Sequence, residues 1–167
     1  YELDYYAPVQ NILVDRNNIQ DWDVFFMEQV KTSNNLIGYD IETSQRDAHE
    51  GIKKLMKIDD DGFSHGKKLL FDFKRTKITG ASFYFGKTHP DKAFYINFGH
   101  ADTHNTIDIS YLLKWMETAK QHNNTLIIHN VPYEYCVHRG SYDQVLPNTL
   151  CSMQLCVTAY NPDEYHK

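Results

Sequence analysis

Residues Leu36–Ser44 read L-I-G-Y-D-I-E-T-S and predict a β-strand that carries two carboxylates, Asp40 and Glu42. Side chains alternate between the two faces of a strand, so Asp40 and Glu42 are expected on one face and Ile41 on the other. Adjacent like charges repel, and a divalent cation offsets that repulsion. Oxygen ligands suit Mg²⁺ or Mn²⁺, and two such ions promote phosphodiester hydrolysis. The alternative is a strand that ends in water with two solvated acidic residues.

The length and composition are those of one globular domain. The chain has 167 residues, 41% of them hydrophobic, and no apolar run of the roughly 18 residues that a membrane span requires. A net charge of −5 argues against coating nucleic acid through charge alone, although it leaves room for a local groove or a metal site. The chain begins with Tyr1, and we expect residues 1–167 to be a single domain at the N-terminus of a longer protein.

Cysteine and histidine usage favours a reducing compartment over a disulfide framework or a zinc site. The chain contains three cysteines, at Cys136, Cys151 and Cys156. An odd number without a C-x-x-C pair is typical of the cytoplasm. His100 and His104 are close in sequence, as are Cys136 and His138, but their spacing matches no recognised zinc motif. Scattered polar histidines are the simpler interpretation.

Hydrophobic periodicity predicts alternating strands and helices around the 36–44 strand. Further strands are expected at 11–15, 77–85, 93–98 and 125–129, and helices at 17–32, 108–122, 132–139 and 149–160. We expect the 125–129 strand to be buried on both faces, and Gly140 to end the third helix. This order predicts an α/β fold with a central mixed β-sheet flanked by helices, whose functional end lies at the carboxyl edge of the central strands.

The polar stretch 45–76 is predicted to be a long insertion loop directly after the two carboxylates. Loops of this length inside a compact domain are usually functional or mobile. The insertion is therefore expected to hang over the candidate site and present its lysines to phosphates. The alternative is a solvated insertion of mixed charge.

Three stretches resemble motifs of one enzyme family. They are G-Y-D-I-E-T-S at 38–44, I-T-G-A-S-F-Y-F with A-F-Y-I-N-F-G-H at 78–85 and 93–100, and I-I-H-N-V-P-Y-E-Y at 127–135. Together they resemble the proofreading 3′–5′ exonuclease domain of family A DNA polymerases, which belongs to the DnaQ-like, ribonuclease H-like superfamily. The Asn-rich and Tyr-rich composition favours a phage-encoded member.

The resemblance implies a ribonuclease H-like fold and hydrolysis of the 3′-terminal phosphodiester of single-stranded or frayed DNA, with release of mononucleotides. It implies two Mg²⁺ or Mn²⁺ ions, a polymerase domain in the parent chain and, for a phage protein, the cytoplasm of a bacterial host. The implied metal ligands and catalytic residues are Asp40, Glu42 and Glu134, and the implied substrate contacts are Thr43, Asn130 and Tyr133.

Two departures from the family pattern bear on activity. Glu134 stands where the family has Asp, and the third family motif, Y-x-x-x-D, is absent from the sequence. We therefore expect this chain alone to be inactive or weak. Two plainer interpretations remain open: Glu134 is a carboxylate stabilised by a helix N-terminus, and Tyr133 is a core residue of that helix.

Two alternatives to proofreading remain. The chain is a non-catalytic exonuclease-like scaffold or DNA-guiding module of a polymerase, or it is an exoribonuclease of the same superfamily that acts on RNA ends.

Overall fold

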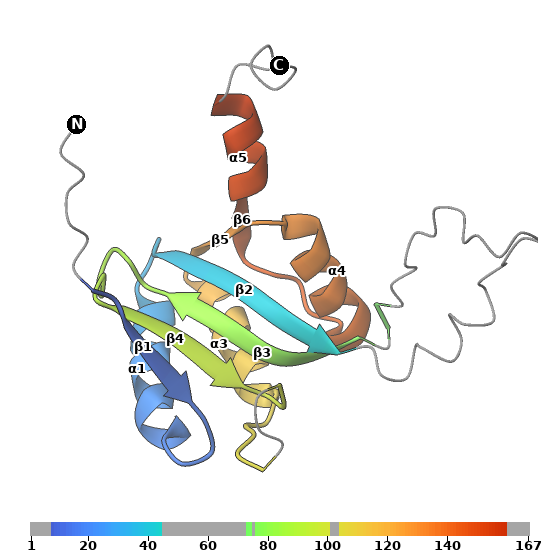
Figure 1. The fold of residues 1–167 in the computed structure, drawn as a ribbon. Coiled ribbons are helices and arrows are strands. Elements are labelled where there is room, and N and C mark those ends of the chain that lie inside the picture. Colours follow the sequence, from blue (N-terminus) through green and yellow to red (C-terminus); the bar gives the residue numbers. More distant parts are fainter. Residues whose placement is uncertain (1–7, 45–72, 75, 101–103, 160–167) are drawn as a thin grey trace, which may run out of the picture.

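The computed structural model describes residues 8–44, 73–74, 76–100 and 104–159 (Figure 1). Its elements are β1 (Gln10–Val14), α1 (Ile19–Lys31), β2 (Leu36–Ser44), β3 (Lys77–Tyr84), β4 (Lys92–Asn97), α3 (Ser110–Gln121), β5 (Thr125–Ile128), α4 (Val131–Tyr142), β6 (Asn148–Cys151) and α5 (Ser152–Ala159). All the strands join one six-stranded sheet in the order β1-β4-β3-β2-β5-β6. The predicted insertion lies outside the described residues, apart from 73, 74 and 76.

The sheet is mixed because β3 runs against both of its neighbours. It pairs antiparallel with β2 and with β4, whereas the pairs β1–β4, β2–β5 and β5–β6 are parallel. The short turn after β3 produces the expected hairpin with β4, and the parallel pair β5–β6 is linked through helix α4. The prediction of an α/β fold with a mixed sheet and flanking helices is confirmed.

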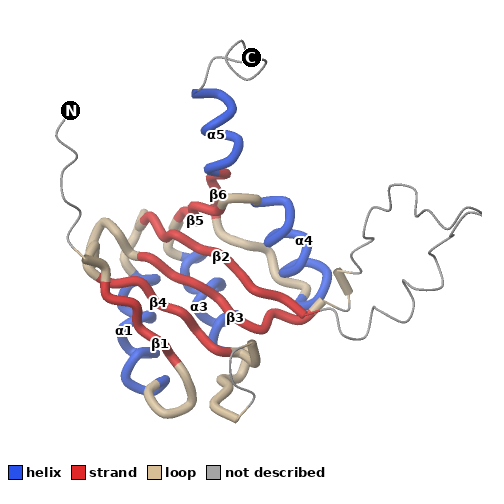
Figure 2. Tube along the Cα trace, in the orientation of Figure 1, coloured by secondary structure: helices blue, strands red, loops and turns tan. Residues whose placement is uncertain are grey.

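Helices α1 and α3 cover one face of the sheet (Figure 2). Their contact is built on Phe26 of α1 and Trp115 of α3, whose rings stack with centroids 4.5 Å apart and are fully buried. The indole Nε1 of Trp115 donates a hydrogen bond of 2.7 Å to Asp23, so its polar edge is satisfied. The helical spacing of apolar residues in 17–32 predicted a buried helix face, and the structure confirms it.

Two buried asparagines fix the start of β2 beside β5. The side-chain oxygen of Asn124 accepts a bond of 2.8 Å from the backbone N–H of Asn35, and its amide donates to the carbonyl of Val30 at 2.6 Å. The backbone N–H of Thr125 in turn donates to the carbonyl of Asn35 at 2.9 Å. Buried amides with these bonds set the register in which β2 and β5 enter the sheet.

The opposite face of the four strands β1, β4, β3 and β2 is open in the part of the chain that the structure describes. Asp40 and Glu42 are exposed on this face, while Ile41 is buried on the helical face. The predicted shared face of the two carboxylates is thus confirmed. The prediction that 125–129 is buried on both faces was wrong, because Ile127 on the open face is 37% exposed.

Two helix boundaries differ from the prediction. Helix α4 continues through Gly140 to Tyr142 and ends at Asp143, whose φ of 49° is left-handed. Gly140 instead allows close packing, since a Cβ at that position would lie 2.6 Å from the carbonyl oxygen of Phe73. Residues 148–151 form strand β6 rather than the start of a helix, because they pair in parallel with β5 before α5 begins at Ser152.

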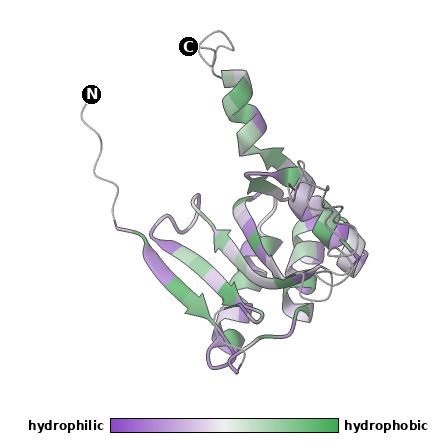
Figure 3. Cartoon of the chain, turned by 45° about the vertical axis from the view of Figure 1, so that its right-hand side comes forward, coloured by the Kyte–Doolittle hydropathy of each residue, from purple (hydrophilic) through white to green (hydrophobic). Residues whose placement is uncertain are grey.

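Helix α5 projects from the sheet and carries hydrophobic residues on an exposed surface (Figure 3). Leu155 is 51% exposed and Val157 is 67% exposed. Among the described helices, none is both long and apolar enough to cross a membrane.

Candidate active site

The second half of β2 faces α4 along one edge of the sheet. Strand β5 pairs with β2 only as far as Gly38, so beyond Gly38 the same edge of β2 faces helix α4. Three side chains of β2 meet three side chains of α4 there: Tyr39 meets His138, Asp40 meets Glu134, and Thr43 meets Tyr133. The first and third sequence motifs are therefore adjacent in space.

The carboxyl group of Glu134 is buried against Asp40. Glu134 is 3% exposed, lies within hydrogen-bonding reach of Asp40, and leaves its Oε2 without a hydrogen-bond partner. Burial, followed by repulsion from the neighbouring carboxylate, raises the pKa of Glu134 to about 7. The pair therefore needs a proton or a cation at neutral pH.

Glu42 lies further along the same face of β2, opposite Gly80 of β3. Burial and the nearby charge of Glu42 raise the pKa of Tyr95 on β4, so Glu42 lies near this tyrosine. The hydroxyl of Tyr95 lies 2.7 Å from Nδ1 of His100. The glycine at 80 leaves room for the Tyr95 ring to lie across β3.

The described residues do not form a complete metal-binding group. Among them, no three His, Cys, Asp or Glu side chains are gathered closely enough to hold an ion. Asp40 and Glu134 nevertheless suit a divalent cation, since both offer carboxylate oxygens and one buried oxygen lacks a partner. The assignment of Asp40, Glu42 and Glu134 as joint ligands stays a prediction.

Thr43 and Tyr133, two predicted substrate contacts, bind each other. Their hydroxyl groups form a short hydrogen bond. A β-bulge between Glu42 and Thr43 shifts the register of β2 at this point and aims Thr43 at the helix. The ring of Tyr133 also packs edge-on against Phe73, with centroids 6.2 Å apart. Tyr133 is therefore half-buried and anchors both flanks of the 45–72 segment.

Asn130, the third predicted substrate contact, precedes α4 at its N-cap position. Its side chain is exposed and makes no capping hydrogen bond, while its carbonyl accepts a bond of 3.0 Å from the backbone N–H of Tyr133. The amide is thus placed at the same end of α4 as Glu134 and is accessible from solvent.

A buried chain of polar groups behind the site was not anticipated from the sequence. Gln144 donates to the carbonyl of Leu113 at 2.8 Å, so its Oε1 accepts from His138 Nδ1 at 3.0 Å. The other ring nitrogen of His138 then accepts the Tyr39 hydroxyl at 2.8 Å. Burial lowers the pKa of His138 to about 4. This neutral imidazole fixes α4 to β2, and among the described residues His138 and Cys136 form no zinc site.

Side chains of β1, β3 and β4 beside Asp40 were also missed. Ser82, Tyr84 and Tyr95 line a pocket that reaches Asp40. The signal was present in the sequence, because residues at alternate positions of a strand share a face. The sequence alone does not show that Asp40 pairs with Ser82 and Ser82 with Tyr95, because these pairs depend on the register between neighbouring strands.

Comparison with solved structures identifies the same fold in other proteins. The chain resembles, with a TM-score of 0.53 and 11% identity, a chain in the structure of the yeast NOT1 MIF4G domain co-crystallized with CAF1, over 92% of this chain and 67% of that one. It resembles Escherichia coli RNase D, an exoribonuclease involved in structured RNA processing, with a TM-score of 0.48, 12% identity and coverage of 96% and 34%. For the RNase domain of yeast Pop2 the TM-score is 0.43, the identity 12% and the coverage 93% and 71%.

The predicted ribonuclease H-like fold class is confirmed, and at this level of identity the likeness concerns the fold. No protein-family model matches the sequence, and no curated protein matches it.

Proposed function

We propose that this chain is an exonuclease domain that hydrolyses the 3′-terminal phosphodiester of single-stranded nucleic acid and releases mononucleotides. The observation that carries the proposal is the buried carboxyl of Glu134 beside Asp40, with one oxygen lacking a partner. A like-charged pair in which one carboxylate lies midway along a central strand is an arrangement that divalent metal stabilises. The order of motifs in the sequence supports the same chemistry.

Asp40 and Glu134 would hold the first divalent ion, and Glu42 would complete the site from the same face of β2. Bound Mg²⁺ or Mn²⁺ supplies an activated water and stabilises the leaving 3′ oxygen. Asn130 would bind the backbone or sugar of the terminal nucleotide from the end of α4. Thr43, held by Tyr133, would contact the same nucleotide.

DNA and RNA 3′ ends are both candidate substrates. The motif resemblance favours DNA and a proofreading role within a phage family A polymerase, with a polymerase domain as partner and the host cytoplasm as location. Two of the compared structures are described as ribonucleases. An exoribonuclease therefore fits the fold as well as a proofreading domain does, since fold alone does not fix the substrate.

The first experiment is a calorimetric titration of the chain with Mn²⁺ at neutral pH. We expect binding by the wild type and its loss in Asp40→Ala. Glu28→Ala is the matched control, because Glu28 is an exposed carboxylate on α1. Binding that is equal in all three proteins would show that the metal site lies elsewhere. Absence of binding in the wild type would favour the non-catalytic scaffold.

A second experiment separates the two substrates. Single-stranded DNA and RNA oligonucleotides of the same base sequence, each labelled at the 5′ end, are incubated with the protein and Mn²⁺. Because the third family motif is absent from this sequence, we expect at most slow stepwise shortening from the 3′ end, abolished in Asp40→Ala. Preferential shortening of RNA would replace the proofreading assignment with the exoribonuclease one. Internal cleavage of either strand would contradict the exonuclease proposal.

A further inference from the structure

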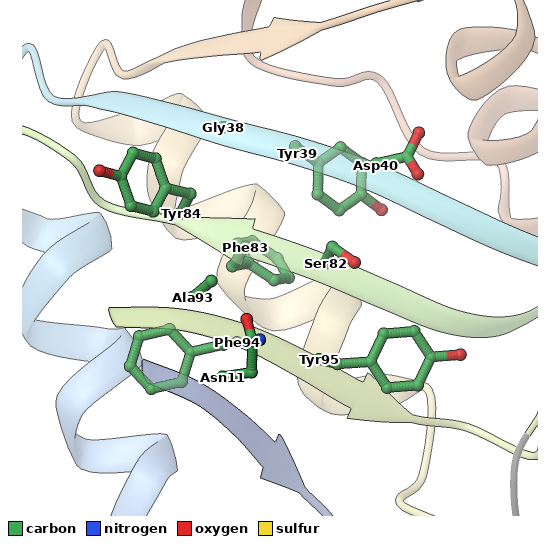
Figure 4. A pocket seen from close by; sticks show the side chains of 10 residues that line it. All are labelled: Asn11, Gly38, Tyr39, Asp40, Ser82, Phe83, Tyr84, Ala93, Phe94 and Tyr95. Carbon is green, nitrogen blue, oxygen red and sulfur yellow. The ribbon is translucent and has the colours of Figure 1, made fainter. Parts of the chain in front are cut away.

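A pocket of about 350 Å³ lies on the open face of the sheet and spans β1, β4, β3 and β2 (Figure 4). Its volume is at the lower end of the roughly 300–1,000 Å³ typical of small-molecule sites. Asp40 forms one part of its wall, so the pocket adjoins one member of the carboxylate pair. It has no role in the hydrolysis described above.

One wall of the pocket is the ring of Tyr84, which stands between small neighbours. In the sheet register, Gly38 and Ala93 lie on either side of Tyr84, and Asn11 follows Ala93 on β1. A Cβ at Gly38 would approach the Cβ of Tyr84 to 3.2 Å, so the absence of a side chain at Gly38 leaves room beside the tyrosine. The Tyr84 hydroxyl donates to the carbonyl of Pro90 at 3.1 Å. The ring is 39% exposed and yet held in place.

Tyr95 forms the opposite wall. It lies on β4, two residues after Ala93, the residue that pairs with Tyr84. Figure 4 shows the Tyr84 and Tyr95 rings at opposite ends of the pocket, with Ser82 and Ala93 between them. Tyr95 is held by the contact of its hydroxyl with His100 at 2.7 Å. Two held aromatic rings therefore lie at the two ends of a floor that offers the hydroxyl of Ser82 and, from β1, the exposed amide of Asn11.

The lining points to the chemistry of the ligand. Among the described residues that line the pocket, none is Lys or Arg, so the pocket does not suit a phosphate. Aromatic faces bind any flat heterocycle, and an amide and a hydroxyl pair with the polar edges of a nucleobase. Tyr84 lies two residues after Ser82 on β3, about 6.7 Å along the strand and on the same face. Ser82 is the residue that pairs with Asp40. A base beside Tyr84 would leave its sugar next to the carboxylates.

We propose that this pocket is a nucleobase-binding subsite that holds one base of the substrate strand beside Asp40, a proposal that rests on the exonuclease function proposed above. Tyr84 provides the stacking surface, Tyr95 closes the far end, and Ser82 and Asn11 contact the edge of the base. The subsite recognises a base as such and not its sequence, because stacking is available to every base.

The test uses nucleosides, which carry a base without a phosphate and need no metal. The chain, labelled with ¹⁵N, is titrated with thymidine and adenosine in EDTA, and amide shifts are followed by NMR. We expect shifts at Gly38, Ser82 and Ala93, and none with 2-deoxyribose alone. Tyr84→Ala should weaken nucleoside binding about 5- to 150-fold, the range for loss of one base–aromatic stack. Tyr84→Phe should retain it.

Tyr135→Ala is the matched control, because Tyr135 is an exposed tyrosine of α4 outside the pocket. It should bind nucleosides as the wild type does. Absence of shifts in the pocket at millimolar nucleoside, or equal binding by Tyr84→Ala and wild type, would overturn the proposal. Tetramethylammonium is titrated in parallel, since tyrosines beside a carboxylate also suit a cation. Its binding at lower concentration than either nucleoside would overturn the base assignment as well.

The outcome is independent of the nuclease test. Metal binding by Asp40 and Glu134 without nucleoside binding would refute the subsite and leave the proposed function standing. Tyr84-dependent nucleoside binding in a protein that binds no Mn²⁺ would refute the nuclease and leave a base-binding surface.

Discussion

The carboxyl groups of Asp40 on β2 and Glu134 on α4 lie within hydrogen-bonding reach of each other across an edge of the sheet. Because their repulsion is not offset by a described cation, Asp40→Ala should leave the fold intact in EDTA and change the free energy of unfolding by less than about 1 kcal/mol. Urea denaturation of both proteins measures this. A loss of several kcal/mol without metal would mean that Asp40 stabilises the fold rather than binds an ion.

Glu134→Gln should stabilise the metal-free protein at pH 8. The folded-state pKa of about 7 lies above the ordinary value of 4.5, so the folded wild type loses stability as pH rises through that interval. The neutral amide avoids this loss. Because Asp40 is exposed and solvent screens the pair, the gain is on the order of 1 kcal/mol. Melting curves at pH 8 and pH 5 should show the difference shrinking at the lower pH, and a constant difference would contradict the shift.

His138 should stay neutral well below its ordinary pKa. Its folded-state pKa of about 4 lies below 6.5, so its contribution to stability is present above pH 6.5 and is lost as pH falls toward 4. That slope is opposite in sign to the slope due to Glu134. NMR titration of the imidazole follows the charge directly. A protonated His138 at pH 6 would disprove the hydrogen-bond chain from Tyr39 through His138 to Gln144.

Phe26→Ala should cost about 3–5 kcal/mol of unfolding free energy. The ring is fully buried and stacks on Trp115 at 4.5 Å, so its removal leaves a cavity between α1 and α3. Val24→Ala on the same helix is the control, because Val24 is 61% exposed and should change stability by less than about 0.5 kcal/mol. Guanidinium denaturation compares them, and equal losses would place the core elsewhere.

Leu112→Ala on α3 should lower the free energy of unfolding by about 2–5 kcal/mol, since Leu112 is also fully buried. Measurement of the double variant with Phe26→Ala then shows whether the two helices share one core. Costs that add without coupling would indicate that Leu112 packs independently of the Phe26 cluster.

Much of the fold was accessible from periodicity, because long amphipathic stretches such as 17–32 report burial directly. The shared face of Asp40 and Glu42 followed from the two-residue repeat of a strand. Strand β6 was missed since its four residues, Asn148–Cys151, carry too few side chains to show a period and are identified by their pairing with β5.

The site was only partly predictable. The proximity of the motifs around Asp40 and Glu134 was implied by a resemblance, whereas the pKa of Glu134 depends on burial that no local pattern reveals. The pocket at Ser82, Tyr84 and Tyr95 depends on register across several strands, which a linear sequence does not encode in any local signal.

Thr43 and Phe73 both contact Tyr133, although a segment of 28 residues, 45–72, separates the two flanks in the sequence. The two described flanks of residues 45–72 thus meet at one side chain of α4. We expect the segment to tolerate replacement by a chain of another length, because the free-energy cost of loop closure changes by only about 0.6 kcal/mol for each doubling of loop length. We therefore expect a short Gly/Ser linker from Ser44 to Phe73 to replace it without displacing Asp40.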